Sequence, residues 1–447
     1  MSLNGESLGT ERVHQLILKF GSFSVIAMLA TGAVSMMGTF IISKGIDIHA
    51  VGAVGILFPL VTLYFGFSQL VAIGSASYIS RMLGKNKKKE AMSAILIAYG
   101  LTLLISILLM VTTWLFKAPI LTFLGADGGY EVLAHTYLSI FIFSIPFTAL
   151  TLLASAVFRA YGKLKLSMLV IVVDALLIIS LDVLLVFIFR QGIGGVAISN
   201  TLAGIASSIL GMVLLIKLTG GYTQLKSAFK WEITILSGVM SIGLSALGRS
   251  LATATFVLTL NHMADRLNGE NALTALGTVN RIIVLLLFSI MGINQALQPV
   301  VSYNFTSGKS DRVKEALKYA LIYSSLIGFI GTLLGLFFPR QVISIFTSQT
   351  DILDDAVLIF SMQLILYVTV GLQTLSATYF QAIGKAWMSF FLSVFKPLLI
   401  LIPLIYFLPH LLGSDISLLW WIFPISDTIA TVICFLMLRN SVKKLTL

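Results

Sequence analysis

Residues 77–91 read SYISRMLGKNKKKEA and residues 302–316 read SYNFTSGKSDRVKEA, so one polar, basic pattern occurs twice in the chain. The two Ser-Tyr pairs and the two Glu-Ala pairs are both related by an offset of 225 in the numbering. A second match joins FRAYGKLKLSM at 158–168 to FQAIGKAWMSF at 380–390, with an offset of 222. Repetition of this kind in a hydrophobic chain predicts two halves built to one plan.

The composition predicts that lipid surrounds much of this chain. Of its 447 residues, 58% are hydrophobic and 11% are charged, whereas a soluble domain carries about 25% charged residues. Cys434 is the single cysteine, so disulfides play no part. The net charge is +11. The distribution of the basic residues along the chain distinguishes between nucleic-acid binding and membrane topology as the reason for that charge.

Twelve apolar stretches are long enough to cross a bilayer as helices. We therefore expect an all-α polytopic membrane protein. The stretches lie near residues 16–43, 50–80, 91–116, 131–157, 166–189, 193–217, 232–261, 271–301, 315–338, 354–382, 388–408 and 417–438.

The basic residues predict the orientation of these spans. With both termini on one side, that side holds 21 of the 29 Lys and Arg residues, and the opposite side holds five. An excess of Lys and Arg marks the cytoplasmic side. We therefore expect a multi-pass protein of the cell (inner) membrane with both termini in the cytoplasm. The charge therefore reports topology, with contacts to anionic lipid headgroups as a secondary effect. Nucleic-acid binding is not expected.

An even number of spans in each half predicts that both halves enter the membrane in the same direction. The two six-helix lobes would then be related by a pseudo-two-fold axis along the membrane normal. The expected segments are a cytoplasmic N-terminal segment at 1–15, an N-terminal lobe at 16–218, a cytoplasmic inter-lobe loop at 219–231, a C-terminal lobe at 232–438 and a cytoplasmic tail at 439–447.

The run GINQALQPVVSYNFTSGKSDRVKEALK at 292–318 resembles the eighth-helix signature of multidrug and toxic compound extrusion (MATE) transporters. The resemblance is to the DinF-like branch, named after a DNA-damage-inducible protein. It extends from about residue 20 to 440 through ordered pieces such as ISRMLGK (79–85), GIGGVAISN (192–200) and PISDTIA (424–430). It implies a twelve-helix, two-lobe antiporter that exports amphipathic, often cationic compounds, coupled to H+ or Na+.

The resemblance also locates a candidate cation site, with two departures. The first-helix acid of the family is replaced by Gly38, and the Asn of its fifth-helix Asn-x-x-x-Asp pattern is replaced by Ile178, while Asp182 is kept. The family's small polar residue on the sixth helix falls at Asn200. Coupling through the N-terminal lobe would therefore rest on Asp182 and Asn200.

Asp182 is the strongest candidate for the coupling residue on physical grounds as well. A carboxylate at membrane depth costs several kcal/mol unless it is paired, hydrated or protonated, and such residues often carry function. Asp174 lies eight residues earlier, which places the two carboxylates about 12 Å apart along one helix. Both could line one cavity. The alternative is that each only accepts hydrogen bonds from neighbouring helices.

Other polar, aromatic and Met side chains in the spans are candidates for a substrate cleft, because such side chains suit varied amphipathic ligands. The alternative role for each is helix packing. The cleft candidates are Tyr64, Phe147, Arg249, Arg281, Met291, Gln295, Gln298 and Tyr303. Three prolines are expected to kink helices, namely Pro59, Pro146 and Pro299.

Asp427 is the acid that lies well inside a span of the second half. Arg249, Arg281 and Lys396 are its possible partners, and we favour a buried ion-pair network that fixes helix packing. An alternative for Lys396 is that its side chain extends to the membrane interface.

We expect a secondary-active multidrug exporter for small organic substrates, monomeric and not an enzyme. The phosphate-binding motif GxxxxGK[ST] is absent, so ATP hydrolysis is not expected, and neither is any cofactor beyond the coupling ion. The histidines are scattered, so we expect no metal site. The alternatives are a flippase for a lipid-linked precursor, a membrane enzyme acting on isoprenoid lipids, whose clustered acids are missing, and a non-transporting relative.

Overall fold

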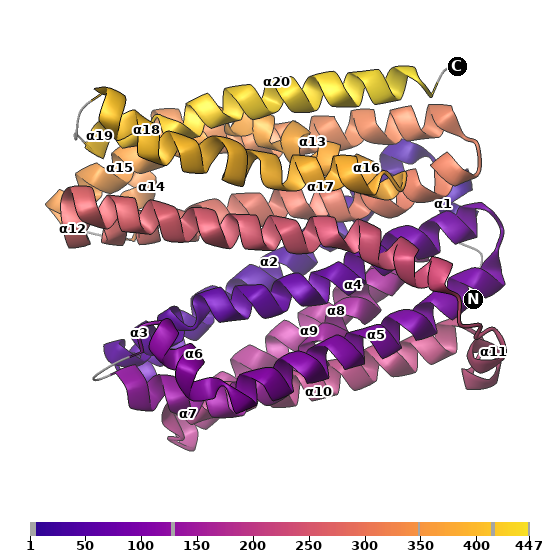
Figure 1. The fold of residues 1–447 in the computed structure, drawn as a ribbon, viewed down its shortest axis with the longest axis horizontal. Helices are drawn as coiled ribbons and strands as arrows, with labels where there is room; N and C mark the ends of the chain where they lie inside the picture. Colours follow the sequence, from indigo (N-terminus) through magenta and orange to yellow (C-terminus); the bar gives the residue numbers. More distant parts are fainter. Residues whose placement is uncertain (1–5, 127–129, 347–348, 413–415, 446–447) are drawn as a thin grey trace. The chain divides into compact units, whose positions relative to one another are not determined.

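The computed structural model describes residues 6–126, 130–346, 349–412 and 416–445, which form helices and no strands (Figure 1). The predicted segments 1–15 and 439–447 are therefore described only in part. The all-α fold that was predicted from the sequence is confirmed.

Contacts divide the chain into two compact units. Of the described residues, those at 6–10 and within 26–250 belong to the first unit, and those at 11–25 and within 251–445 belong to the second.

The first part of the chain forms both short and long helices. They are α1 (Glu6–Thr10), α2 (Val13–Gly45), α3 (Ile48–Ile56), α4 (Phe58–Gly84), α5 (Lys88–Leu115), α6 (Lys117–Phe123), α7 (Glu131–Phe141), η2 (Ile142–Ser144), α8 (Ile145–Ala160), α9 (Leu164–Val183), the π-helix η3 (Leu184–Ile188), α10 (Gly192–Leu218) and α11 (Tyr222–Ser227).

The rest of the chain repeats this order with differences. Its helices are α12 (Ile233–Thr306), α13 (Ser310–Phe337), α14 (Pro339–Ser344), α15 (Thr350–Leu364), η4 (Tyr367–Thr369), α16 (Val370–Ala382), α17 (Ala386–Val394), the π-helix η5 (Phe395–Leu401), α18 (Ile402–Leu412), α19 (Ile416–Leu419) and α20 (Ile422–Lys443).

Eleven helical stretches among the described residues are long and apolar enough to cross a membrane. A twelfth span is formed if the pair Ile352–Leu364 and Tyr367–Ala382, which is bent by 41°, is taken as one. The helix α12 contributes two of the spans, Ile233–Ala264 and Ala272–Thr306. The structure thus agrees with the twelve spans predicted from hydrophobicity.

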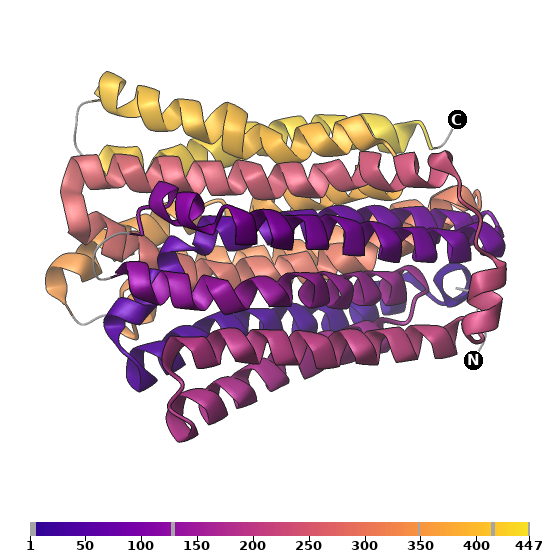
Figure 2. The same ribbon diagram turned by 60° about the horizontal axis from the view of Figure 1, so that its bottom comes forward.

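The helix α5 shows why these sequences form spans. Its exposed face carries Leu104, Leu108 and Val111, which are 42–66% exposed and recur at spacings of four and seven residues, as expected for side chains that face lipid. Its opposite face buries the small residues Ala98, Thr102 and Ser106, which allow close helix packing. This face packs against α4 and α8 in the first unit (Figures 1 and 2).

Each of the two units contains the same contact between a serine hydroxyl and a backbone carbonyl. In the first unit, the Ser80 hydroxyl donates to the Ala160 carbonyl over 3.3 Å, and in the second the Ser302 hydroxyl donates to the Ala382 carbonyl over 3.0 Å. The two serines are related by an offset of 222, and so are the two alanines. The same contact therefore joins the corresponding pair of spans in both units.

The turns after these spans keep the same register. Asn86 and Gly308, again related by the offset of 222, both adopt positive φ angles, of 59° and 74°. This conformation closes the turn that leads to Lys87 and Lys309, the residues immediately before α5 and α13. The offset of 225 suggested by the Ser-Tyr and Glu-Ala matches is thus wrong by three positions, and the offset of 222 holds for both matches.

Candidate functional site

Asp182 lies near the end of α9 and is 2% exposed. Ser199, on α10, donates a hydrogen bond from its hydroxyl to Asp182 Oδ1. The same hydroxyl lies 2.8 Å from the Gly195 carbonyl of its own helix. The helices α9 and α10 pack together along the first unit, and this packing brings the carboxylate and the hydroxyl into contact.

The other two residues of the predicted coupling site lie near Asp182 in the sequence but do not contact it through any recorded bond. Asp174 is half-buried on α9, eight residues before Asp182. Asn200 follows Ser199, but its amide donates to the Val196 carbonyl of α10 over 2.8 Å. Within the described part of the chain, neither Asp174 nor Asp182 forms an ion pair.

Gly38 occupies the position of the family's first-helix acid. It is half-buried on α2, and a Cβ atom placed on it would meet no atom within 4 Å. Sterics at the Cβ position therefore do not explain the loss of the acid.

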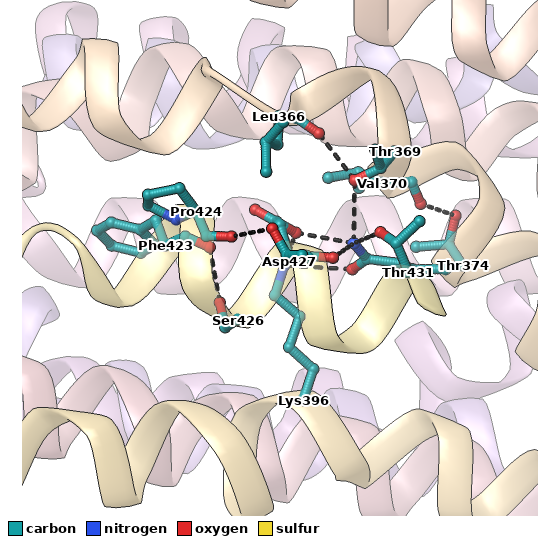
Figure 3. Close-up of polar contacts among 12 residues, drawn as sticks. Leu366, Thr369, Val370, Thr374, Lys396, Phe423, Pro424, Ser426, Asp427 and Thr431 are labelled. Atoms are coloured by element: carbon teal, nitrogen blue, oxygen red, sulfur yellow. Dashed lines mark hydrogen bonds and ion pairs between the residues drawn. The ribbon is translucent and has the colours of Figure 1, made fainter. Parts of the chain in front are cut away.

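A second polar cluster lies in the second unit, where Asp427 of α20 forms an ion pair with Lys396 of η5 (Figure 3). Gln373, on α16, links the two, because its Nε2 lies 2.8 Å from Asp427 Oδ1 and its Oε1 lies 3.2 Å from Lys396 Nζ. Thr431 and Thr369 complete the cluster, with hydroxyls 3.1 and 3.2 Å from Gln373 Nε2.

This cluster decides among the partners predicted for Asp427. The expectation of a buried ion pair is confirmed with Lys396 as the partner, and the alternative that Lys396 extends to the membrane interface is wrong. Arg249 is half-buried and Arg281 is exposed, and neither is in an ion pair within the ranges that the structure describes.

The face of α20 that carries Asp427 also carries the one cysteine of the chain. Cys434 is 3% exposed and lies seven residues after Asp427. Seven residues are close to two helical turns, so the two side chains share a face.

The predicted cleft residues are divided between the units. Tyr64, in the first unit, is buried, and its hydroxyl lies 2.6 Å from that of Thr113. Gln298, in the second, is also buried. The remaining members, apart from the two arginines, are half-buried, and these are Phe147, Met291, Gln295 and Tyr303. Their role as a cleft stays a prediction.

The three prolines differ in position. Pro59 and Pro146 stand in the first turns of α4 and α8, where a missing N–H is tolerated, and Pro299 lies inside α12. Whether they produce functional kinks stays a prediction.

Four residues of these polar sites were not predicted from the sequence, namely Ser199, Gln373, Thr369 and Thr431. A signal existed for Gln373, because an amide inside an apolar span commonly bonds to another helix. Serines and threonines are too frequent in these spans to stand out. Among the described residues, no group of three or more His, Cys, Asp or Glu side chains is placed to hold a metal ion.

Comparison with known proteins gives consistent matches along the chain. The family model MatE matches residues 24–184 and 245–407, which is one segment in each half, in keeping with the repeat. The multidrug export protein MepA of Staphylococcus aureus is 25% identical over 404 residues, which cover 90% of this chain and 88% of MepA.

Two solved structures share the fold closely. One is the outward-facing conformation of a multidrug resistance MATE family transporter, with a TM-score of 0.93, 21% identity and coverage of 99% of this chain and 98% of that one. The other is a MOP superfamily transporter from Pyrococcus furiosus, described as having a binding pocket of reversed polarity. Its TM-score is 0.92, with 20% identity and 99% coverage of both chains. The fold is therefore the twelve-helix, two-lobe fold of these structures.

Proposed function

Because this multi-pass membrane protein belongs to the MATE family of transporters, which are not enzymes, we propose that it exports amphipathic organic cations from the cell in exchange for H+ or Na+. The name of MepA, a multidrug export protein, supports the substrate class. The run at 292–318 supports assignment to the DinF-like branch.

The observation that carries the proposal is the environment of Asp182. The carboxylate is buried in a span, and its recorded side-chain partner is a neutral hydroxyl, that of Ser199. A hydroxyl can donate to an ionised carboxylate or accept from a protonated one. The site therefore tolerates either charge state, which an ion-coupling residue must do.

The coupling follows from this tolerance. Binding of an ion at Asp182, with Asp174 and Asn200 as further members of the site, favours one conformation of the transporter. The shift is limited to the difference in ion affinity between the two conformations. Substrate binding then favours the other conformation, and the lobes alternate between inward-open and outward-open states.

The orientation within the cell membrane is part of the proposal. Both termini face the cytoplasm, since 21 of 29 basic residues lie on that side. We also propose that the working transporter is a monomer.

The test is uptake of a fluorescent organic cation into inside-out vesicles under an imposed proton or sodium gradient. Wild type, Asp182→Asn and the control Glu131→Gln, which removes an exposed acid of the same unit, would be compared. We expect one gradient to drive accumulation in wild type. This accumulation should be reduced at least about tenfold in Asp182→Asn and unchanged in the control.

Gradient-driven accumulation in Asp182→Asn at the wild-type rate would place coupling elsewhere. Accumulation under neither gradient, with folded protein, would favour the flippase for a lipid-linked precursor or a non-transporting relative.

A further inference from the structure

Two spans of the second unit lose their regular α-helical backbone beside Asp427. The tenth span is bent by 41° where α15 meets η4, and Thr369 lies in that 3-10 turn. The eleventh span contains the π-helix η5, which holds Lys396 and Pro397. Interrupted helices at membrane depth are tolerated where they are buried or line a cavity, and they often mark binding sites in transporters.

The oxygens around Gln373 Nε2 outnumber the two hydrogens of that amide. Gln373 Nε2 carries two hydrogens, yet four oxygens lie within 3.5 Å of it. They are Asp427 Oδ1 at 2.8 Å, Thr431 Oγ1 at 3.1 Å, Thr369 Oγ1 at 3.2 Å and the Asp427 carbonyl at 3.4 Å. The Lys396 ammonium binds Asp427 Oδ1 and Gln373 Oε1. The ammonium of Lys396 therefore occupies the oxygen-rich site around Asp427.

Two further hydroxyls in the same region have no partner. Tyr367, in η4, and Ser393, just before η5, are 5% and 6% exposed, and their hydroxyls make no hydrogen bond to any described residue. Tyr367 shares the turn η4 with Thr369, whose hydroxyl contacts Gln373. Buried polar groups are normally hydrogen-bonded, so these two hydroxyls are available to contact a bound ligand.

The two members of the ion pair differ in accessibility. The Lys396 side chain is 25% exposed, whereas that of Asp427 is 5% exposed. Lysine carries its charge on a flexible four-carbon stem, while Asp427 is held by Gln373. Lys396 is therefore the partner that can leave.

We propose that Asp427 is a cation-exchange site, at which a monovalent cation binds by displacing the ammonium of Lys396. The single carboxylate matches one positive charge, and Gln373, Thr369 and Thr431 supply neutral oxygens. A divalent ion would call for more carboxylates. Lys396 thus acts as a tethered competitor that keeps the site neutral until a ligand arrives.

The cation could be inorganic, as a coupling ion, or organic, as a substrate. This inference deepens the proposed function and rests on it for the choice of probes. The test measures binding and not transport, so a negative result leaves export through Asp182 untouched.

The experiment is equilibrium binding of radiolabelled tetraphenylphosphonium, and separately of sodium, to the purified full-length protein. Wild type would be compared with Lys396→Met, with Lys396→Met/Asp427→Asn and with Lys385→Met, which removes an exposed lysine of the same unit. Removing a competitor raises the apparent affinity by the reciprocal of the fraction of sites that it had left free. We expect at least about tenfold tighter binding of one probe in Lys396→Met, loss of that gain in the double variant and no change in Lys385→Met.

The probe that gains affinity identifies the source of the cation. Unchanged or weaker binding of both probes in Lys396→Met would overturn the proposal, and so would a gain that persists in the double variant.

A measurement on wild type covers the case in which Lys396→Met does not fold. Reductive methylation followed by mass spectrometry reports how accessible each lysine amine is. With a saturating probe, we expect Lys396 to react at least about twofold faster, because displacement frees its ammonium, while Lys385 stays constant. No change at Lys396 with either probe would overturn the proposal.

Discussion

The two units carry one backbone plan and opposite charge chemistry. Asp174 and Lys396 each lie eleven residues after the lysine at the start of their span, Lys163 or Lys385, and are related by the repeat offset of 222. The first unit thus has an acid where the second has a base. Buried Asp182 has a neutral hydroxyl partner, whereas buried Asp427 has an ammonium.

This difference shows what each unit can do with a charge. The acid of the first unit can gain or lose a cation without leaving an opposite charge unpaired. The acid of the second unit is already neutralised, so a change there exposes Lys396. The predictions below test this contrast, beginning with the largest effect.

Removing the acid should cost far more stability in the second unit. Asp427→Asn leaves the Lys396 ammonium without its carboxylate. Breaking a buried pair costs about 3–5 kcal/mol, and we expect the lower end of that range because the Lys396 side chain is 25% exposed. Asp182→Asn keeps a hydrogen-bonding group beside the Ser199 hydroxyl and should cost about 1 kcal/mol or less. Thermal unfolding of both variants in one detergent measures the difference. Equal losses would remove the contrast.

Replacing a glycine by alanine should have opposite effects on stability in two corresponding helices, α13 and α5. A Cβ on Gly328 would lie 2.6 Å from the Tyr367 carbonyl oxygen at the bend of the tenth span. The backbone must shift, at a cost of about 2 kcal/mol. A Cβ on Gly100 meets nothing within 4 Å, so Gly100→Ala should stabilise α5 by about 0.5 kcal/mol. A Gly328→Ala variant with wild-type unfolding temperature would refute the close approach.

The hydroxyl of Ser199 should matter more than other serine hydroxyls of α10. Ser199→Ala removes a hydrogen bond to a carboxylate, worth about 1.5 kcal/mol. Ser208→Ala is the matched control, because that hydroxyl bonds only to the Ile205 carbonyl of its own helix among the bonds recorded. Unfolding of the two variants should differ by about 1 kcal/mol, and identical stabilities would argue against a role for the Ser199–Asp182 bond.

The smallest effect should be the same in both units. Ser80→Ala and Ser302→Ala each remove one hydroxyl-to-carbonyl bond of the repeated contact. Each should cost about 1 kcal/mol, as for an ordinary neutral hydrogen bond. Stabilities that differ by more than about 1 kcal/mol would show that the repeat is conserved in geometry but not in energy.

The sequence predicted the fold well, because span length and hydrophobicity follow directly from the bilayer. It misjudged the register of the repeat. The matching Ser-Tyr and Glu-Ala letters differ from the true register by three positions, which is close to one helical turn, so the helical pattern also fitted. The turns at Asn86 and Gly308 fix the register, and these two positions hold different residues.

The sequence was less informative about the polar sites. Asp182 stood out because an acid in a span is rare, but Ser199 did not, since its partner is set by how α9 and α10 pack. Lys396 and the two arginines were equal candidates for Asp427. Only the fold, which brings η5 against α20, selects Lys396.

Cys434 is positioned so that its reaction with a thiol reagent reports on motion near Asp427 in the unmodified protein. It is the one thiol in the sequence, it is buried, and it shares a face of α20 with Asp427 two turns away. A thiol reagent can reach it only when the contacts over that face open. The labelling rate of the unmodified protein therefore measures how often this face becomes accessible. A change in that rate on adding a cation would show that cation binding alters the motion of α20, without any engineered label.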